Sequence, residues 1–179
     1  MAGLVVSADS LGKRRYVIQR YFIPLSDIQH PPIFQRTVGA SVSYGLGADP
    51  GADLRAARYR SRNQRVFLNY FEVWRPQERG ASFALEKAYL HLDVPFPSGT
   101  GDEEVLALHC EPILPNQSAY KYKRGPHVHV SGNKRDISKS HIALCLIDLE
   151  RTCADLQQFN TAFSVMIRMV GDELLDRFA

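Results

Sequence analysis

The clearest structural signal in the sequence is the stretch Phe83-Ala-Leu-Glu-Lys-Ala-Tyr-Leu-His-Leu-Asp-Val94. Its residues divide into two alternating sets, as the side chains of a β-strand alternate between the faces of a sheet. One set is Phe83, Leu85, Lys87, Tyr89, His91 and Asp93, and the other is Ala84, Glu86, Ala88, Leu90, Leu92 and Val94. The stretch therefore predicts a long strand that carries Tyr89 and His91 on one face.

Similar apolar and β-branched segments lie on both sides of this stretch. They predict further strands over residues 14–25, 37–44, 65–74, 104–111, 120–130 and 141–147. Short segments rich in proline or glycine separate most of them, as at 95–102 and 112–117. Because parallel neighbours need long crossover connections, these short turns favour an antiparallel meander.

The last thirty residues follow a different, helical period. Apolar side chains recur there at spacings of three and four: Leu149, Cys153, Leu156, Phe163, Met166, Ile167, Val170 and Leu174. Asp148 is a suitable N-cap, and Asn160 is a suitable cap for a second helix after a break near Phe159. We expect an α+β fold in which a mainly antiparallel sheet of about six to seven strands packs one face against a helix or helix pair at 149–178.

Length and composition indicate one globular domain over residues 1–179. Hydrophobic residues make up 45% of the chain and charged residues 23%, which is enough apolar material for a core. Three cysteines without a C-x-x-C pair suit a reducing compartment, and no apolar run approaches the roughly 20 residues that span a bilayer. The sequence therefore predicts a cytoplasmic protein that does not enter a membrane.

Positive charge is concentrated in one segment, although the net charge is only +3. Residues 55–65 hold five arginines and no acid, within a Gly- and Arg-rich stretch, 45–64, that predicts a loop. Arg58, Arg60 and Arg62 are candidate phosphate ligands, so an anionic partner such as a nucleotide or nucleic acid is expected. The alternative is a solvated surface loop.

The residues with the most chemical potential lie at 120–141. His127 and His129 are two apart on a predicted strand, so both imidazoles leave the same face. His109 belongs to the adjoining strand, His141 begins the following one, and His91 lies one strand further back. A His-x-His pair presents two nitrogens to one metal ion, or places an acid and a base around a reacting group.

A metal site would combine His109, His127 and His129 with Glu111 or Asp136. Six lysines and arginines in the same stretch would repel a divalent ion. The sequence therefore argues against a divalent metal and assigns no cofactor.

Metal-independent phosphate-ester chemistry uses those cations instead. His127 and His129 would carry protons, with His109 and His141 as further candidates. The candidate charge-stabilising and phosphate-binding residues are Lys123, Arg124 and Lys139, and Tyr120 and Tyr122 are placed to stack on a base.

Three functions are consistent with these patterns. The first is a phosphate-ester hydrolase or phosphodiesterase that acts on a nucleotide or nucleic acid through the His-x-His strand. The second is a non-catalytic module that binds a nucleotide or nucleic acid. The third is a structural or regulatory protein that binds a partner chain through its C-terminal helix. Separately, the alternative for the histidine cluster is an ordinary structural role within the sheet.

Overall fold

An antiparallel sheet is the main element of the computed structural model, which describes residues 4–77, 81–95, 101–112, 127–130, 140–143, 155–173 and 175. In the described chain the sheet has nine strands, and its main path is β2-β3-β5-β6-β7-β8-β9. β1 pairs with β6, β4 pairs with β5, and all pairings are antiparallel. The strands are β1 (Val5–Ser7), β2 (Ile33–Val38), β3 (Ser41–Leu46), β4 (Tyr59–Arg60), β5 (Phe67–Pro76), β6 (Ser82–Pro95), β7 (Asp102–Cys110), β8 (His127–Val130) and β9 (Ser140–Ala143).

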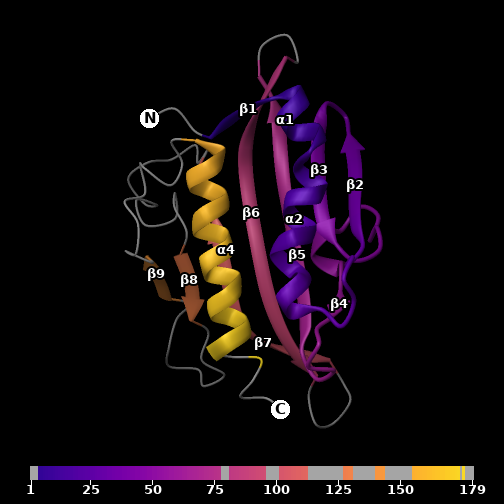
Figure 1. Cartoon of the computed structure of the whole chain (residues 1–179), viewed down its shortest axis with the longest axis vertical. Coiled ribbons are helices and arrows are strands. Elements are labelled where there is room, and N and C mark those ends of the chain that lie inside the picture. Colours follow the sequence, from indigo (N-terminus) through magenta and orange to yellow (C-terminus); the bar gives the residue numbers. More distant parts are fainter. Residues whose placement is uncertain are drawn as a thin grey trace.

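Two helices cover one face of this sheet. α2 (Arg14–Phe22) lies over the β3 and β5 side, and α4 (Leu156–Glu173) lies beside it toward β8 (Figure 1). The short helices are α1 (Ala8–Gly12), η1 (Ile23–Leu25) and η2 (Leu54–Ala56). The arrangement confirms the expected α+β fold, with consecutive antiparallel strands and a C-terminal helix on one face. Among the described helices, none combines the length and apolar character that crossing a lipid bilayer requires.

The main core fills the space between these helices and the sheet. Ile18 of α2 and Phe163 of α4 pack there with Trp74, Leu90 and Leu108 of the strands, and all five side chains are buried. A smaller cluster occupies the opposite face: Phe34, Ala57, Phe71, Val73 and Tyr89. The segment around η2 is held against that second face, because the Asn69 amide donates to the carbonyl oxygens of Leu54, Arg55 and Ala57.

A buried ion pair links α2 to the centre of the sheet. The Arg14 guanidinium, 1% exposed, donates to both carboxylate oxygens of Glu72, which is fully buried, with an Nε–Oε2 distance of 2.7 Å. Trp74 Nε1 donates to the same carboxylate at 2.9 Å, and the Tyr70 hydroxyl donates to its other oxygen. Burial, and then the Glu72 charge, raise the pKa of Tyr70 well above its ordinary value, so this hydroxyl remains a donor.

The prediction of a strand over 14–25 is wrong, because this segment forms α2 and η1. Its β-branched and aromatic residues resembled a strand, yet the positions it buries are Arg14, Ile18, Tyr21, Phe22 and Leu25. These lie three and four residues apart, which is the spacing of one helix face.

Two other boundaries also differ from expectation. The expected strand over 37–44 is two strands, because Gly39, with φ of 60°, turns the chain between β2 and β3. The expected break near Phe159 is also wrong, since α4 continues through Asn160. Asn160 does not cap a helix, and its side-chain oxygen instead accepts hydrogen bonds from Arg14 and Tyr21. The Asp155 carboxylate accepts from the Gln158 backbone at 2.8 Å, and Asp148 lies outside the described residues.

Strict alternation along β6 is interrupted by a bulge. Val73 pairs with Lys87 but Trp74 pairs with Leu85, so Glu86 is an extra residue. Leu85 therefore points into the main core with Leu90, and not to the face of Lys87 as the sequence predicted. The Gly/Arg-rich stretch 45–64 contains the end of β3, then η2 and β4.

Candidate functional site

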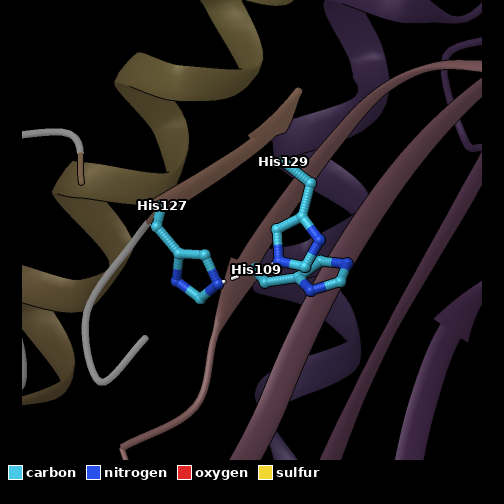
Figure 2. A group of neighbouring side chains, drawn as sticks. All are labelled: His109, His127 and His129. Atoms are coloured by element: carbon cyan, nitrogen blue, oxygen red, sulfur yellow. Dashed lines mark hydrogen bonds between the residues drawn. The ribbon is translucent and has the colours of Figure 1, made fainter. Parts of the chain in front are cut away.

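Three histidines meet on the sheet face that lies opposite α2 and α4. His109 of β7 is paired in register with His127 of β8, and Ala107 is paired with His129. Directly opposed residues share a face, as do residues two apart on one strand, so the three imidazoles leave the sheet on one side. Figure 2 shows the rings of His127 and His129 turned toward each other, with the His109 ring beside them. The shared face of His127 and His129 is as the spacing predicted, the strand register adds His109, and the predicted roles of the three residues stay predictions.

The three rings offer closely spaced nitrogens. One ring nitrogen from each of His109, His127 and His129 lies within 4.8 Å of the other two, and the His127 and His129 Nε2 atoms are 3.1 Å apart. Zinc–nitrogen bonds of about 2.0–2.1 Å place tetrahedral ligands about 3.4 Å from one another. The His127–His129 edge of the cluster is close to that spacing, and the other nitrogen pairs lie within 4.8 Å.

A fourth histidine and a glutamate extend the cluster along β6 and β7. His91 Nε2 lies 3.2 Å from His109 Nε2, and His91 Nδ1 lies 2.7 Å from Glu104 Oε2. The Tyr89 ring stacks on the His109 ring, with centroids 3.9 Å apart and planes inclined by 16°. Tyr89 also donates a hydrogen bond to Glu111. The His109 ring is therefore held by a stacked aromatic ring and by a second imidazole.

A second bulge brings Glu104 to this face. Leu92 pairs with Leu106 but Asp93 pairs with Glu104, so Val105 is an extra residue in β7. In a regular strand Glu104 would alternate with Val105 and point away from His109. The bulge turns it to the face of Asp93 and His91, and bulges frequently re-aim a side chain in this way.

The electrostatic environment keeps His109 neutral. Burial, followed by the neighbouring His129, His91 and His127 and then by Arg55, lowers its pKa to about 2. A neutral imidazole has a lone pair available for a metal ion or an acidic proton, so the protonation state suits a ligand. Burial, followed by the hydrogen bond to Glu111, raises the pKa of Tyr89, which keeps the hydroxyl protonated.

The other predicted metal ligands are placed differently. Glu111 accepts a hydrogen bond from Tyr89, and it does not belong to the group of converging ligand atoms found among the described residues. Asp136 lies outside the described residues, as do Lys123, Arg124, Lys139, Tyr120 and Tyr122, so their predicted roles stay predictions. His141 is the register partner of His129 on β9, as the strand order predicted.

The arginines of residues 55–65 make most of their described contacts with residues other than the histidines. Arg58 forms an ion pair with Asp102, and the guanidinium groups of Arg58 and Arg60 lie 5.8 and 5.0 Å from the ring centroid of Phe67. The Arg62 backbone donates to the Leu25 carbonyl at 2.8 Å. Arg55, which the sequence did not single out as a phosphate ligand, contributes to the low pKa of His109.

Sequence reasoning placed His91 near the site but missed the contributions of Glu104, Tyr89 and Arg55. Alternation did predict that Tyr89 shares a face with His91. Nothing in the local sequence marks the bulge at Val105 that brings in Glu104. Comparisons of the chain with protein-family models, curated proteins and solved structures found no match.

Proposed function

We propose that His109, His127 and His129 hold a transition-metal ion of the zinc class, and that this site hydrolyses a phosphate ester. The observation that supports the proposal is the convergence of one ligand nitrogen from each ring within 4.8 Å. Three imidazole nitrogens suit zinc, copper or nickel, whereas magnesium and calcium prefer oxygen ligands.

Burial and ring geometry suit a bound ion. His127 is fully buried and His109 nearly so, and one nitrogen of each converges with one nitrogen of His129. An ion bound there would accept one lone pair from each of the three rings, as in zinc sites with three histidine ligands. The sequence argument against a metal depended on lysines and arginines at 121–139, which lie outside the described residues.

Three protein ligands are the number found in catalytic zinc sites, where a water molecule takes the fourth position. A zinc ion lowers the pKa of that water to about 7 and so supplies a nucleophile at neutral pH. In phosphate-ester hydrolysis, water forms a new P–O bond, the ester P–O bond breaks, and the alcohol leaves with a proton.

Cations near the cluster support a phosphate ester as the substrate class. The charge of Arg55 reaches both His109 and Tyr89, and the Lys87 ammonium lies 5.8 Å from the Tyr89 ring centroid. Positive groups on this side of the sheet would stabilise negative charge that develops on phosphoryl oxygens. Whether the substrate is a nucleotide or a nucleic acid, and the cytosolic location expected from the cysteines, stay predictions.

Metal binding is tested by titrating the metal-free protein with Zn²⁺ in competition with a chromophoric chelator, and with Co²⁺ for its visible spectrum. We expect one ion per chain and intense tetrahedral Co²⁺ bands. The variants His109→Asn, His127→Asn and His129→Asn should each lose binding. His30→Asn is the matched control, because His30 is exposed and remote in sequence from the cluster. Stoichiometric binding that survives all three substitutions would refute the site.

Hydrolysis is tested with bis(p-nitrophenyl) phosphate and p-nitrophenyl phosphate on the zinc-loaded protein. We expect turnover that disappears with chelator and in His127→Asn, and that returns when zinc is added to the wild-type chain. Metal binding without turnover of either ester would remove the hydrolase and leave a metal site.

A metal-independent acid–base pair is the second candidate, and it is supported by the 3.1 Å separation of the His127 and His129 Nε2 atoms. In that case turnover would persist in chelator. The binding-module hypothesis predicts affinity for an anionic oligomer that falls steeply with salt and no turnover. The helix-partner hypothesis gains no support from the described residues, because α4 packs Phe159, Phe163 and Ile167 into the core.

A further inference from the structure

The hydrogen-bonded chain Glu104–His91–His109 is the strongest unassigned feature of the molecule. Glu104 Oε2 lies 2.7 Å from His91 Nδ1, and His91 Nε2 lies 3.2 Å from His109 Nε2. Among the described residues His91 lies outside the group of converging ligand atoms, and it reaches the candidate metal centre through His109. The chain depends on the bulge at Val105, which places Glu104 on the histidine face.

We infer that Glu104 and His91 are positioning residues that fix which nitrogen of His109 is available as a ligand. This inference rests on the proposed metal site and specifies its second layer of contacts. Metal-bound histidines commonly donate their other N–H to a carboxylate or carbonyl, which sets the tautomer and the ring orientation. Here a neutral imidazole stands between the carboxylate and the ligand.

The tautomers follow from donor and acceptor rules. A carboxylate can only accept, so His91 carries its proton on Nδ1 and donates it to Glu104. Neutral His91 then has a lone pair on Nε2, and this lone pair accepts the N–H of His109 Nε2. His109 is left with its lone pair on Nδ1.

The contacts with His91 and Tyr89 also fix the orientation of the His109 ring. His109 Nε2 is engaged by His91, and the flat side of the ring is covered by Tyr89 at a centroid distance of 3.9 Å. A flip of the ring about its Cβ–Cγ bond would break the contact with His91. The Nδ1 atom is therefore the ligand atom that His109 contributes beside His127 and His129.

Nuclear magnetic resonance of the metal-free protein tests the tautomer directly. Two-bond ¹H–¹⁵N spectra distinguish Nδ1–H from Nε2–H imidazoles, and the six histidines of the chain are assigned by single His→Gln variants. At pH 8, about 1.5 units above the ordinary histidine pKa, we expect Nδ1–H for His91 and Nε2–H for His109. A proton on His109 Nδ1, or a protonated His91, would overturn the inference whether or not the protein binds metal.

Zinc affinity provides the second test. Glu104→Gln and His91→Phe should weaken zinc binding by about 10- to 100-fold, while the Co²⁺ spectrum keeps its tetrahedral form because the three ligands remain. Glu103→Gln is the matched control, since it removes the same charge from the neighbouring position of β7 and should leave affinity unchanged.

The two tests separate this inference from the proposed function. If the wild-type chain binds no zinc, the metal site fails, and the tautomer spectra still report on the hydrogen-bonded chain. If the wild type binds zinc and both variants bind it equally well, the positioning role fails alone. A changed Co²⁺ coordination in His91→Phe would also overturn it, because His91 would then be a ligand itself. Thermal unfolding monitored by circular dichroism shows that each variant is folded.

Discussion

The buried Arg14–Glu72 pair makes a sharp test of how α2 is anchored to the sheet. Glu72 is fully buried and its carboxylate accepts from Arg14, Tyr70 and Trp74. Replacing it with glutamine preserves its size and removes its charge. The Arg14 guanidinium, 1% exposed, would then be buried without its counter-ion.

The expected loss of stability follows from that uncompensated charge. Breaking a buried ion pair by removing one partner costs about 3–5 kcal/mol. Glutamine retains one carbonyl oxygen, so part of the donor set is still satisfied, and we expect a loss near the lower limit, about 3 kcal/mol. This is a large part of the roughly 5–15 kcal/mol by which domains are stable. Arg14→Met should cost a similar amount, and the double variant should cost less than the sum of the two.

Urea unfolding measures the loss of unfolding free energy in each variant, and Trp74, which donates to Glu72, serves as the fluorescent probe. Trp74 is the single tryptophan of the chain and is fully buried, so its fluorescence reports directly on the region. Arg75–Glu86 is the matched control, because it pairs the same residue types at 2.6 Å with side chains 59% and 23% exposed. Glu86→Gln should cost less than about 1 kcal/mol. Equal losses for Glu72→Gln and Glu86→Gln would refute the reasoning.

Three further predictions concern the site and the sheet. Below pH 6.5 the unfolded chain binds a proton at His109, while the native ring, with its pKa lowered to about 2, stays neutral. The free energy of unfolding should therefore fall by at most about 1.4 kcal/mol for each pH unit below 6.5. Urea unfolding in the presence of chelator should show a weaker dependence of this free energy on pH for His109→Asn. Gly45→Ala should destabilise by about 1–3 kcal/mol, because a Cβ atom there would overlap the Phe34 ring and a backbone oxygen, whereas Gly12→Ala, with open space around it, should not. Zinc at 100 times its dissociation constant should raise unfolding free energy by about 2.7 kcal/mol, and this gain should vanish in His127→Asn or when chelator removes the ion.

The sheet was predictable because its signals are local. The alternation of β6 and the short turns after it indicate neighbouring antiparallel strands without any knowledge of tertiary contacts. α2 was not predictable in the same way, because Tyr, Val, Ile and Phe within 14–25 favour a strand by composition. The spacing of Ile18, Phe22 and Leu25 fits a helix, but it could not outweigh that composition. The contact of Arg14 with Glu72, 58 positions away, leaves no mark in the neighbouring sequence.

In the candidate site, too, some features follow from the local sequence and others depend on tertiary structure. The shared face of His127 and His129 follows from a spacing of two, and the pairing of β7 with β8 brings in His109. Glu104 could not be assigned, because strict alternation places it on the core face and only the bulge at Val105 reverses this. The role of Arg55 depends on how the segment around η2 folds back over the sheet, which is set by the hydrogen bonds of the Asn69 side chain.

The core fixes the position of the histidines, because the two faces of the sheet alternate along the same strands. Leu90, Leu108 and Val128 form one continuous cross-strand row, with Leu90 opposite Leu108 and Leu108 opposite Val128, and they pack under the helices. Each has a histidine as its next neighbour in sequence. A slip of β8 by one residue against β7 would turn His127 and His129 toward the core and expose Val128. The packing that stabilises the fold therefore also sets the register that brings the imidazoles of His109, His127 and His129 together.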